Sequence, residues 1–244
     1  MSVFLYQFPV SHYCEKVRWV LDYKKIEYKK INLVPGPHIS RVRKIAANSF
    51  VPVLEHHGDI VQGSSQILDY LEEHYPDKPL VPADEDLARR VQDWEARLDE
   101  VAGPAVRTFV YHYLLPQPGV IIPLLGAKQP WFMRLFLRVG YRRISSVMRR
   151  WMKINEASAH QAMDDMDRIL GELRQIYAHN RFLVGDAFTR ADLTACSLFA
   201  PLFQPSGYGL KWPSMKHAPE EMAQWLESHE GALRSLALRY EQNR

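Results

Sequence analysis

The sequence predicts an α/β domain with a mixed sheet, followed by an all-helical domain. Residues 1–75 alternate short apolar runs with helical patterns, in the order βαβαββα. Three prolines within residues 76–82 then interrupt both patterns. From there on, apolar residues recur at helical spacing. We therefore place the domains at residues 1–76 and 87–244, with a linker at 77–86.

The elements of the first domain follow from two kinds of local pattern. Apolar runs rich in β-branched residues predict strands, and apolar positions three and four residues apart predict helices. His57–Gly58, between the last two strands, is typical of a tight hairpin turn. In chain order, we expect strand 2–8, helix 12–25, strand 26–33, a weak helix within 36–48, strands 51–56 and 59–63, and helix 64–75.

The second domain is predicted from longer helical patterns. Residues 87–115 form one long helix with a bend near Gly103–Pro104, since proline disturbs a helix interior. Residues 116–130 contain four prolines, and we expect them to be irregular. The remaining predicted elements are a basic amphipathic helix at 131–152, a packed helix at 153–178, a buried helix at 189–203 and two short helices at the end.

Composition limits the class of protein. With 244 residues, 47% of them apolar and 24% charged, the chain can bury an ordinary core. Its two cysteines, Cys14 and Cys196, imply no disulfide framework and favour a reducing compartment, so we expect a cytoplasmic protein. We expect no secretory signal, and no uncharged apolar run approaches the ~18 residues of a transmembrane helix.

Positive charge is concentrated in one part of the second domain. Residues 101–155 contain nine Lys or Arg and no Asp or Glu, although the net charge is only +3. Within residues 131–153, two apolar stripes are rotated relative to one another, which predicts a helix break near Gly140. The arginines fit a solvated helix face, an anionic electrophile or product, or weak contact with an acidic membrane surface. No DNA-binding motif is present in the sequence, so we expect no nucleic-acid partner.

The stretch SHYC, where the first strand gives way to the first helix, carries a hydroxyl and a thiol three residues apart. The first turn of a helix has unpaired N–H groups and a partial positive charge, which stabilise a thiolate of the protein or of a ligand. Ser11 can donate a hydrogen bond to the same anion. Alternatively, Ser11 is only a helix N-cap and Cys14 only a small buried residue.

Two further patterns indicate peptide and carboxylate binding. A cis bond between Val51 and Pro52 would turn the Val51 backbone towards an extended peptide, whereas a trans edge proline would not. Ser64 and Ser65 open a predicted helix, where N–H groups and hydroxyls bind carboxylates or simply cap the helix.

The order and spacing of these patterns resemble the cytosolic glutathione transferase superfamily. The matching segments, which cover most of the chain, are SHYCEKVRW, NLVPGPHIS, VPVL, GSSQILDYLE and FLVGDAFTRADL. The resemblance implies a thioredoxin-like N-terminal domain with an all-helical C-terminal domain, a homodimer, and glutathione as co-substrate without a metal. It leaves residues 115–152 as a family-variable insertion. Thr189 and Asp192 form a capping box that nucleates the buried helix.

The resemblance also implies roles for individual residues. Ser11 matches the hydroxyl that activates glutathione in serine-type members such as the theta class, with Cys14 as second choice and Tyr6 as third. Val51 would pair with the cysteinyl part of glutathione, and Ser64 would hold its γ-glutamyl carboxylate. The other glutathione candidates are His38, Lys44, Pro52 and Gly63. Candidates for the hydrophobic pocket of the second substrate, although such aromatics more commonly pack in a core, are Phe109, Tyr111, Tyr113 and Trp131.

We therefore predict a glutathione transferase of the detoxifying kind, whose glutathione thiolate attacks a hydrophobic or anionic electrophile. Two alternatives remain open: a glutathione-dependent thiol-redox enzyme that uses Cys14, and a non-catalytic binding or scaffold protein. Two departures from the family pattern leave room for the scaffold. Gly63 stands where the family has Glu, Gln or Asp, with Gln62 as a candidate substitute, and residues 48–50 lack the Asn-Pro turn.

Overall fold

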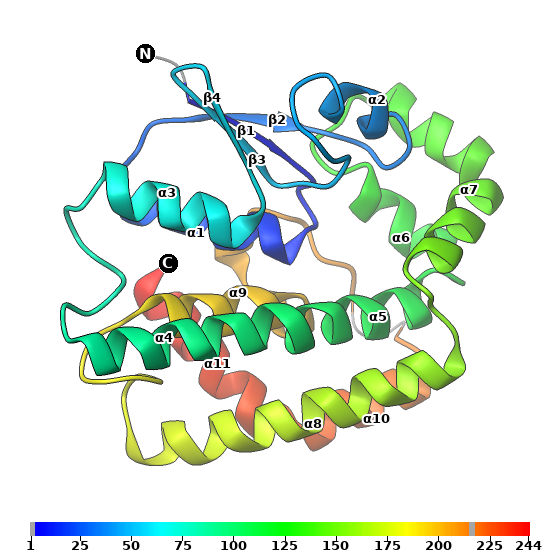
Figure 1. Cartoon of the computed structure of the whole chain (residues 1–244). Coiled ribbons are helices and arrows are strands. Elements are labelled where there is room, and N and C mark those ends of the chain that lie inside the picture. The colour runs from blue at the N-terminus through cyan, green and yellow to red at the C-terminus, as the bar shows by residue number, and fades with distance from the viewer. Residues whose placement is uncertain (1–2, 215–217) are drawn as a thin grey trace.

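The computed structural model describes residues 3–214 and 218–244. Figure 1 shows a small sheet with its helices on one side of the molecule and a layer of longer helices on the other. The predicted order βαβαββα and the helical remainder are both confirmed.

The sheet forms because four short apolar runs pair in the order β2–β1–β3–β4. In these pairs, β1 (Val3–Gln7) runs parallel to β2 (Lys29–Asn32), while β3 (Val53–His56) runs antiparallel to both β1 and β4 (Asp59–Gln62). His57 and Gly58, both with positive φ, form the predicted tight turn. Strand β2 starts at Lys29 and not at residue 26, because the pairing of β2 with β1 begins with Lys29 opposite Phe4.

Three helices complete the N-terminal domain: α1 (His12–Tyr23), α2 (His38–Val42) and α3 (Ser64–His74). Helices α1 and α3 lie side by side on one face of the sheet (Figure 1). The predicted apolar face of α1 is buried, since Val17, Val20 and Leu21 are all fully shielded from solvent.

The second part of the chain is helical, as predicted. Its helices are α4 (Glu85–Arg97), α5 (Gly103–Leu114), α6 (Pro118–Leu125), α7 (Trp131–Trp151), α8 (Glu156–His179), α9 (Arg190–Phe203), α10 (Glu220–Ser228) and α11 (Glu230–Asn243). Helix α9 is buried almost throughout and begins with the predicted capping box, in which Asp192 Oδ2 accepts from the Thr189 N–H at 3.2 Å. None of the helices in the described part of the chain is long and apolar enough to cross a membrane.

At the position of the predicted bend near Gly103, the structure has a π-helical segment, Leu98–Ala102, that joins α4 to α5. Pro104 has no N–H to give to the carbonyl four residues before it. The Gly103 N–H bonds to the Leu98 carbonyl, five residues back, which is the π-helical pattern.

Two predictions for the region after α5 are wrong. Residues 116–130 are not irregular throughout, because they contain α6. Pro118 sits in the first turn of α6, where its missing N–H costs nothing. Helix α7 continues through Gly140 without a break, at a cost of only about 1 kcal/mol for the glycine. The residues of the first stripe are exposed, whereas in the second stripe Met148 is buried and Val147 and Trp151 are 48% and 68% exposed.

Candidate functional site

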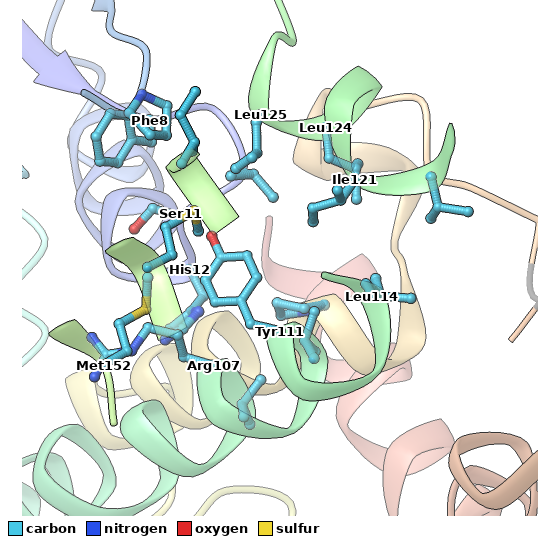
Figure 2. A pocket seen from close by; sticks show the side chains of 18 of the residues that line it. Phe8, Ser11, His12, Arg107, Tyr111, Leu114, Ile121, Leu124, Leu125 and Met152 are labelled. Carbon is cyan, nitrogen blue, oxygen red and sulfur yellow. The ribbon is translucent and has the colours of Figure 1, made fainter. Parts of the chain in front are cut away.

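A cavity of about 480 Å³ lies between the start of α1 and helices α5, α6 and α7. In Figure 2, Ser11, His12 and Arg107 lie on one side of it, and Leu124 and Leu125 on the other. Among the residues that the structure describes, no Asp or Glu lines this cavity. An apolar wall with a few polar groups at one end is typical of small-molecule sites.

Ser11 is the N-cap of α1 and lies half-buried at the cavity wall. Its Oγ accepts a hydrogen bond from the Cys14 backbone N–H at 3.3 Å. A hydroxyl that accepts one hydrogen bond still has its own proton to donate. Together with the first-turn N–H groups of the helix, Ser11 offers a site for an anion at the wall.

The other two candidates for the thiol-activating group lie away from the cavity. Cys14 is fully buried, and burial raises the pKa of its thiol. Tyr6 donates through Oη to Glu55 at 2.8 Å, and burial together with that bond raises its pKa. Neither residue lines the cavity, so of the three candidates only Ser11 is placed to contact a ligand there.

The start of α1 is fixed against α5 by a close contact. Tyr13 Oη donates to the carbonyl oxygen of Asp99, in the π-helical segment, at 2.8 Å. A Cβ atom on Gly103 would lie only 2.1 Å from that Oη, so a larger residue would force the two helices apart. This contact sets the distance between the start of α1 and the cavity-lining side chains of α5.

Three polar side chains surround the Ser11 end of the cavity. His12 is buried, and burial together with the charge of Arg107 lowers its pKa to about 3, so the ring is neutral at pH 7. Burial raises the pKa of Tyr111 to about 12, so its hydroxyl stays protonated and can donate. Of these three side chains only Arg107 is therefore charged, and Arg143 of α7 is a second cation in the cavity lining.

Of the predicted glutathione-binding residues that follow α1, some line the cavity and others do not. The Val51–Pro52 bond is cis, as expected, and both Val51 and His38 line the cavity. His38 Nδ1 accepts from the Gly36 N–H at 3.1 Å, and burial lowers the pKa of its ring. Lys44 is exposed after α2 and does not line the cavity.

The segment before α3 shows how the departure at Gly63 is accommodated. Gly63 has a φ of 105°, which favours glycine. The side-chain amide of Gln62, the candidate substitute, makes three hydrogen bonds of 2.8–3.0 Å with the backbone of residues 48–50. These bonds hold the loop that leads to Val51. Ser64 is buried at the start of α3 and lies outside the cavity lining.

The four aromatic candidates for the second-substrate pocket do not lie together. Tyr111 lines the cavity. Phe109 and Tyr113 are buried on another face of α5, with their rings 5.1 Å apart, and Trp131 is 77% exposed at the start of α7. Sequence reasoning missed Arg107, which lies one turn before Tyr111 on the cavity face of α5. The i, i+4 spacing of these two residues was the available signal.

Comparisons with known proteins agree with this geometry. Residues 5–79 match the family described as glutathione S-transferase, N-terminal domain. Glutathione S-transferase 1 of Dianthus caryophyllus is 36% identical over 95 residues, which cover 38% of this chain and 42% of that protein. Maleylacetoacetate isomerase of Dictyostelium discoideum is 41% identical over 83 residues, covering 32% of this chain and 38% of that protein. The chain thus spans less than half the length of these relatives.

Solved structures match over nearly the whole chain. A glutathione S-transferase from Methylobacterium radiotolerans, in complex with glutathione sulfonate, has a TM-score of 0.64 at 21% identity, covering 99% of this chain and 91% of that one. β-Etherase LigF from Sphingobium sp. strain SYK-6 has a TM-score of 0.65 at 19% identity, covering 98% and 100%. At these identities the likeness concerns the fold.

A thioredoxin-like domain, a cis proline beside the start of α1 and a helical remainder define the glutathione transferase class of fold. Residues 5–79 match the N-terminal domain of the glutathione S-transferase family, and the chain as a whole has the fold of that class.

Proposed function

We propose that this protein is a glutathione transferase that activates the thiol of glutathione for attack on an electrophilic small molecule. The observation that carries the proposal is the cavity itself, where Ser11, the start of α1 and Val51 meet a wall of apolar helices. The thiolate accepts a hydrogen bond from the Ser11 hydroxyl, the Val51 backbone pairs with the cysteinyl unit, and Ser64 binds the γ-glutamyl carboxylate. No metal takes part in this scheme.

The burial of Cys14 supports conjugation over redox chemistry. A cysteine that exchanges disulfides needs an accessible thiolate of lowered pKa. Cys14 is fully buried, and burial raises the pKa of its thiol. The thiol that reacts is therefore that of glutathione, held at the wall by Ser11.

Calorimetric titration with glutathione and conjugation of a generic aryl halide test the proposal. The parent protein, Ser11→Ala and Cys14→Ala are compared. Loss of conjugation in Ser11→Ala alone is the expected result. Loss in Cys14→Ala alone would favour the thiol-redox enzyme, and absence of glutathione binding in the parent would favour the scaffold.

A second candidate is glutathione-dependent isomerisation, since some relatives are named maleylacetoacetate isomerase. An isomerase returns glutathione unchanged, whereas a transferase consumes one thiol for each product molecule. Thiol titration during turnover separates the two, and stoichiometric consumption is expected here.

The exposed side of α7 supports a weaker, additional contact with an acidic membrane surface. Trp131, Phe132 and Val139 are 77%, 54% and 83% exposed, and the helix carries arginines without a single acidic residue. Apolar side chains flanked by arginine are typical of helices that lie in a lipid interface. Co-sedimentation with vesicles that contain phosphatidylserine, but not with neutral ones, is the expected result. Sedimentation without lipid measures the oligomeric state of the protein and tests the proposed homodimer, to which the exposed face of α7 would contribute if it binds a second copy in place of a membrane.

Both cysteines are unpaired, which fits the proposed cytoplasmic location.

A further inference from the structure

We infer that the electrophile of this site carries a carboxylate that Arg107 binds, attached to a mainly apolar body. The inference rests on the proposed function and names the chemical class of its second substrate.

Arg107 is a cation that has no counter-ion among the residues that the structure describes. The residue is half-buried on the cavity wall, and its buried Nε has no hydrogen-bond partner among the described residues. No acidic residue lines the described cavity, and residues 101–155 contain none at all. A charge withdrawn from water without a partner costs free energy, which an anionic ligand would offset.

The chemistry of the guanidinium selects the kind of anion. Its planar array of donors matches the two oxygens of a carboxylate, in a bidentate pair that a lysine cannot form. The protonated hydroxyl of Tyr111, one turn further along α5, faces the same cavity and supplies another donor. His12 is neutral beside them, so it does not supply a competing charge.

The rest of the cavity fits an apolar body. Leu114, Ile121 and Leu124 line the side opposite Arg107 in Figure 2, and Met148 of α7 adds a buried apolar surface. A ligand that places its anion on Arg107 would therefore lay its apolar part along α6 and α7. Its reactive carbon would then lie within the cavity that Ser11 borders.

A matched pair of electrophiles tests this arrangement: 4-(chloromethyl)benzoate and its methyl ester. In both, the glutathione sulfur forms a bond to the benzylic carbon while the C–Cl bond breaks. Chloride leaves with the electron pair, and the thiol proton passes to solvent. The two compounds differ only in the carboxylate, so the ratio of their kcat/KM values reports its recognition.

The parent protein is expected to prefer the acid, and Arg107→Met is expected to lower the acid-to-ester ratio by about 10- to 100-fold, the effect of losing a hydrogen bond to a charged group. Arg107→Lys, which retains the charge without the bidentate geometry, is expected to restore part of the ratio. Arg174→Met, on the exposed side of α8 and outside the cavity lining, is the matched control and should leave the ratio unchanged.

Two results would overturn the inference. One is a parent protein without preference for the acid. The other is an equal loss with acid and ester in Arg107→Met, or a loss confined to glutathione affinity, because Arg107 would then act on glutathione.

Binding of the unreactive 4-methylbenzoate, measured by calorimetry with the same variants, separates this inference from the proposed function. Arg107-dependent binding of the benzoate without conjugation of either electrophile would refute the transferase and retain the anion site. Conjugation of both electrophiles without Arg107-dependent binding would retain the transferase and refute the anion site.

Discussion

Removing the amine of Lys16 is predicted to destabilise the protein far more than removing an exposed charge. Lys16 lies on α1, and its side chain is fully buried. Its Nζ lies 2.7 Å from Glu95 and 2.6 Å from Asp99, so it joins α1 to α4 and to the π-helical segment beside the cavity. Lys16→Met approximately keeps the length of the side chain and removes the charge, together with the hydrogen bond that Nζ donates to Ser65 Oγ at 3.3 Å.

The structure sets the size of the effect. Breaking a buried ion pair by removing one partner costs about 3–5 kcal/mol, because the remaining charge is left unpaired. Glu95 keeps Arg190 at 2.8 Å, so the charge left without a counter-ion is mainly Asp99, which is 15% exposed and still accepts a hydrogen bond from the Ser65 hydroxyl at 2.6 Å. We therefore expect about 3 kcal/mol, at the lower end of that range, out of a total stability of about 5–15 kcal/mol.

Urea unfolding followed by tryptophan fluorescence measures the difference. The matched control is Arg89→Met, which removes a cation from an exposed pair whose side chains are 67% and 85% exposed and should cost at most about 1 kcal/mol. Adding Asp99→Asn to Lys16→Met should recover part of the loss, because no unpaired carboxylate then remains. If Lys16→Met unfolds within about 1 kcal/mol of the Arg89→Met control, the buried network does not hold the two layers together as argued.

Three further predictions concern the same region. Ser11→Ala should lower the free energy of unfolding by about 0.5–2 kcal/mol, because α1 loses its N-cap. It should also raise the pKa of the bound glutathione thiol by about one unit, measured by thiolate absorbance. An unchanged thiol pKa would exclude Ser11 as the hydrogen-bond donor. Gly103→Ala should destabilise the protein by about 1–3 kcal/mol in urea unfolding, because the added Cβ atom clashes with Tyr13. Gly171→Ala in α8, where the Cβ atom meets open space, should stabilise the protein by about 0.5–1 kcal/mol. Equal effects of the two substitutions would contradict the close contact at Gly103. Burial raises the pKa of Glu95, but its ion pairs outweigh this and lower it, so its contribution is complete above the unfolded pKa of about 4.3 and is lost as pH falls through the lower folded value. A Glu95→Gln variant should therefore lose less stability than the parent between pH 5 and pH 3 in urea titrations, and parallel curves would contradict the pairing.

Most of the N-terminal domain was predictable because its signals are local. The apolar run of the first strand, the apolar face of α1 and the turn at His57–Gly58 each act over a few residues, and all three are present. Helix α6 was not predictable in the same way. Prolines in its sequence read as helix breakers, and only the observed position of Pro118 in the first turn shows that a helix can start there.

The walls of the cavity needed three-dimensional information. Ser11, His38 and Val51 were found from a motif, because the N-terminal domain brings them together in a fixed order. On α5, the candidates for the second-substrate pocket were chosen because they are aromatic. That choice included Phe109, which packs in the core, and left out Arg107, which lines the cavity. Which residues of a helix face a cavity depends on the rotation of the helix about its axis. The rotation of α5 relative to α1 depends on the contact at Gly103, which no local sequence pattern reveals.

The acid-free block of residues 101–155 shows why a charge count cannot assign a role to each arginine. Counted along the chain, its cations predict a single basic region. In the structure, the phase of α5 turns the half-buried Arg107 towards the cavity, where the exposed Arg143 of α7 also lies, while Arg138 and Arg142 of α7 are exposed and outside its lining. A half-buried cation in an apolar wall retains less solvation than the exposed arginines, so it gains more from an anionic ligand. Salt should therefore screen contacts of the exposed α7 arginines with a charged surface much more strongly than recognition of a carboxylate by Arg107.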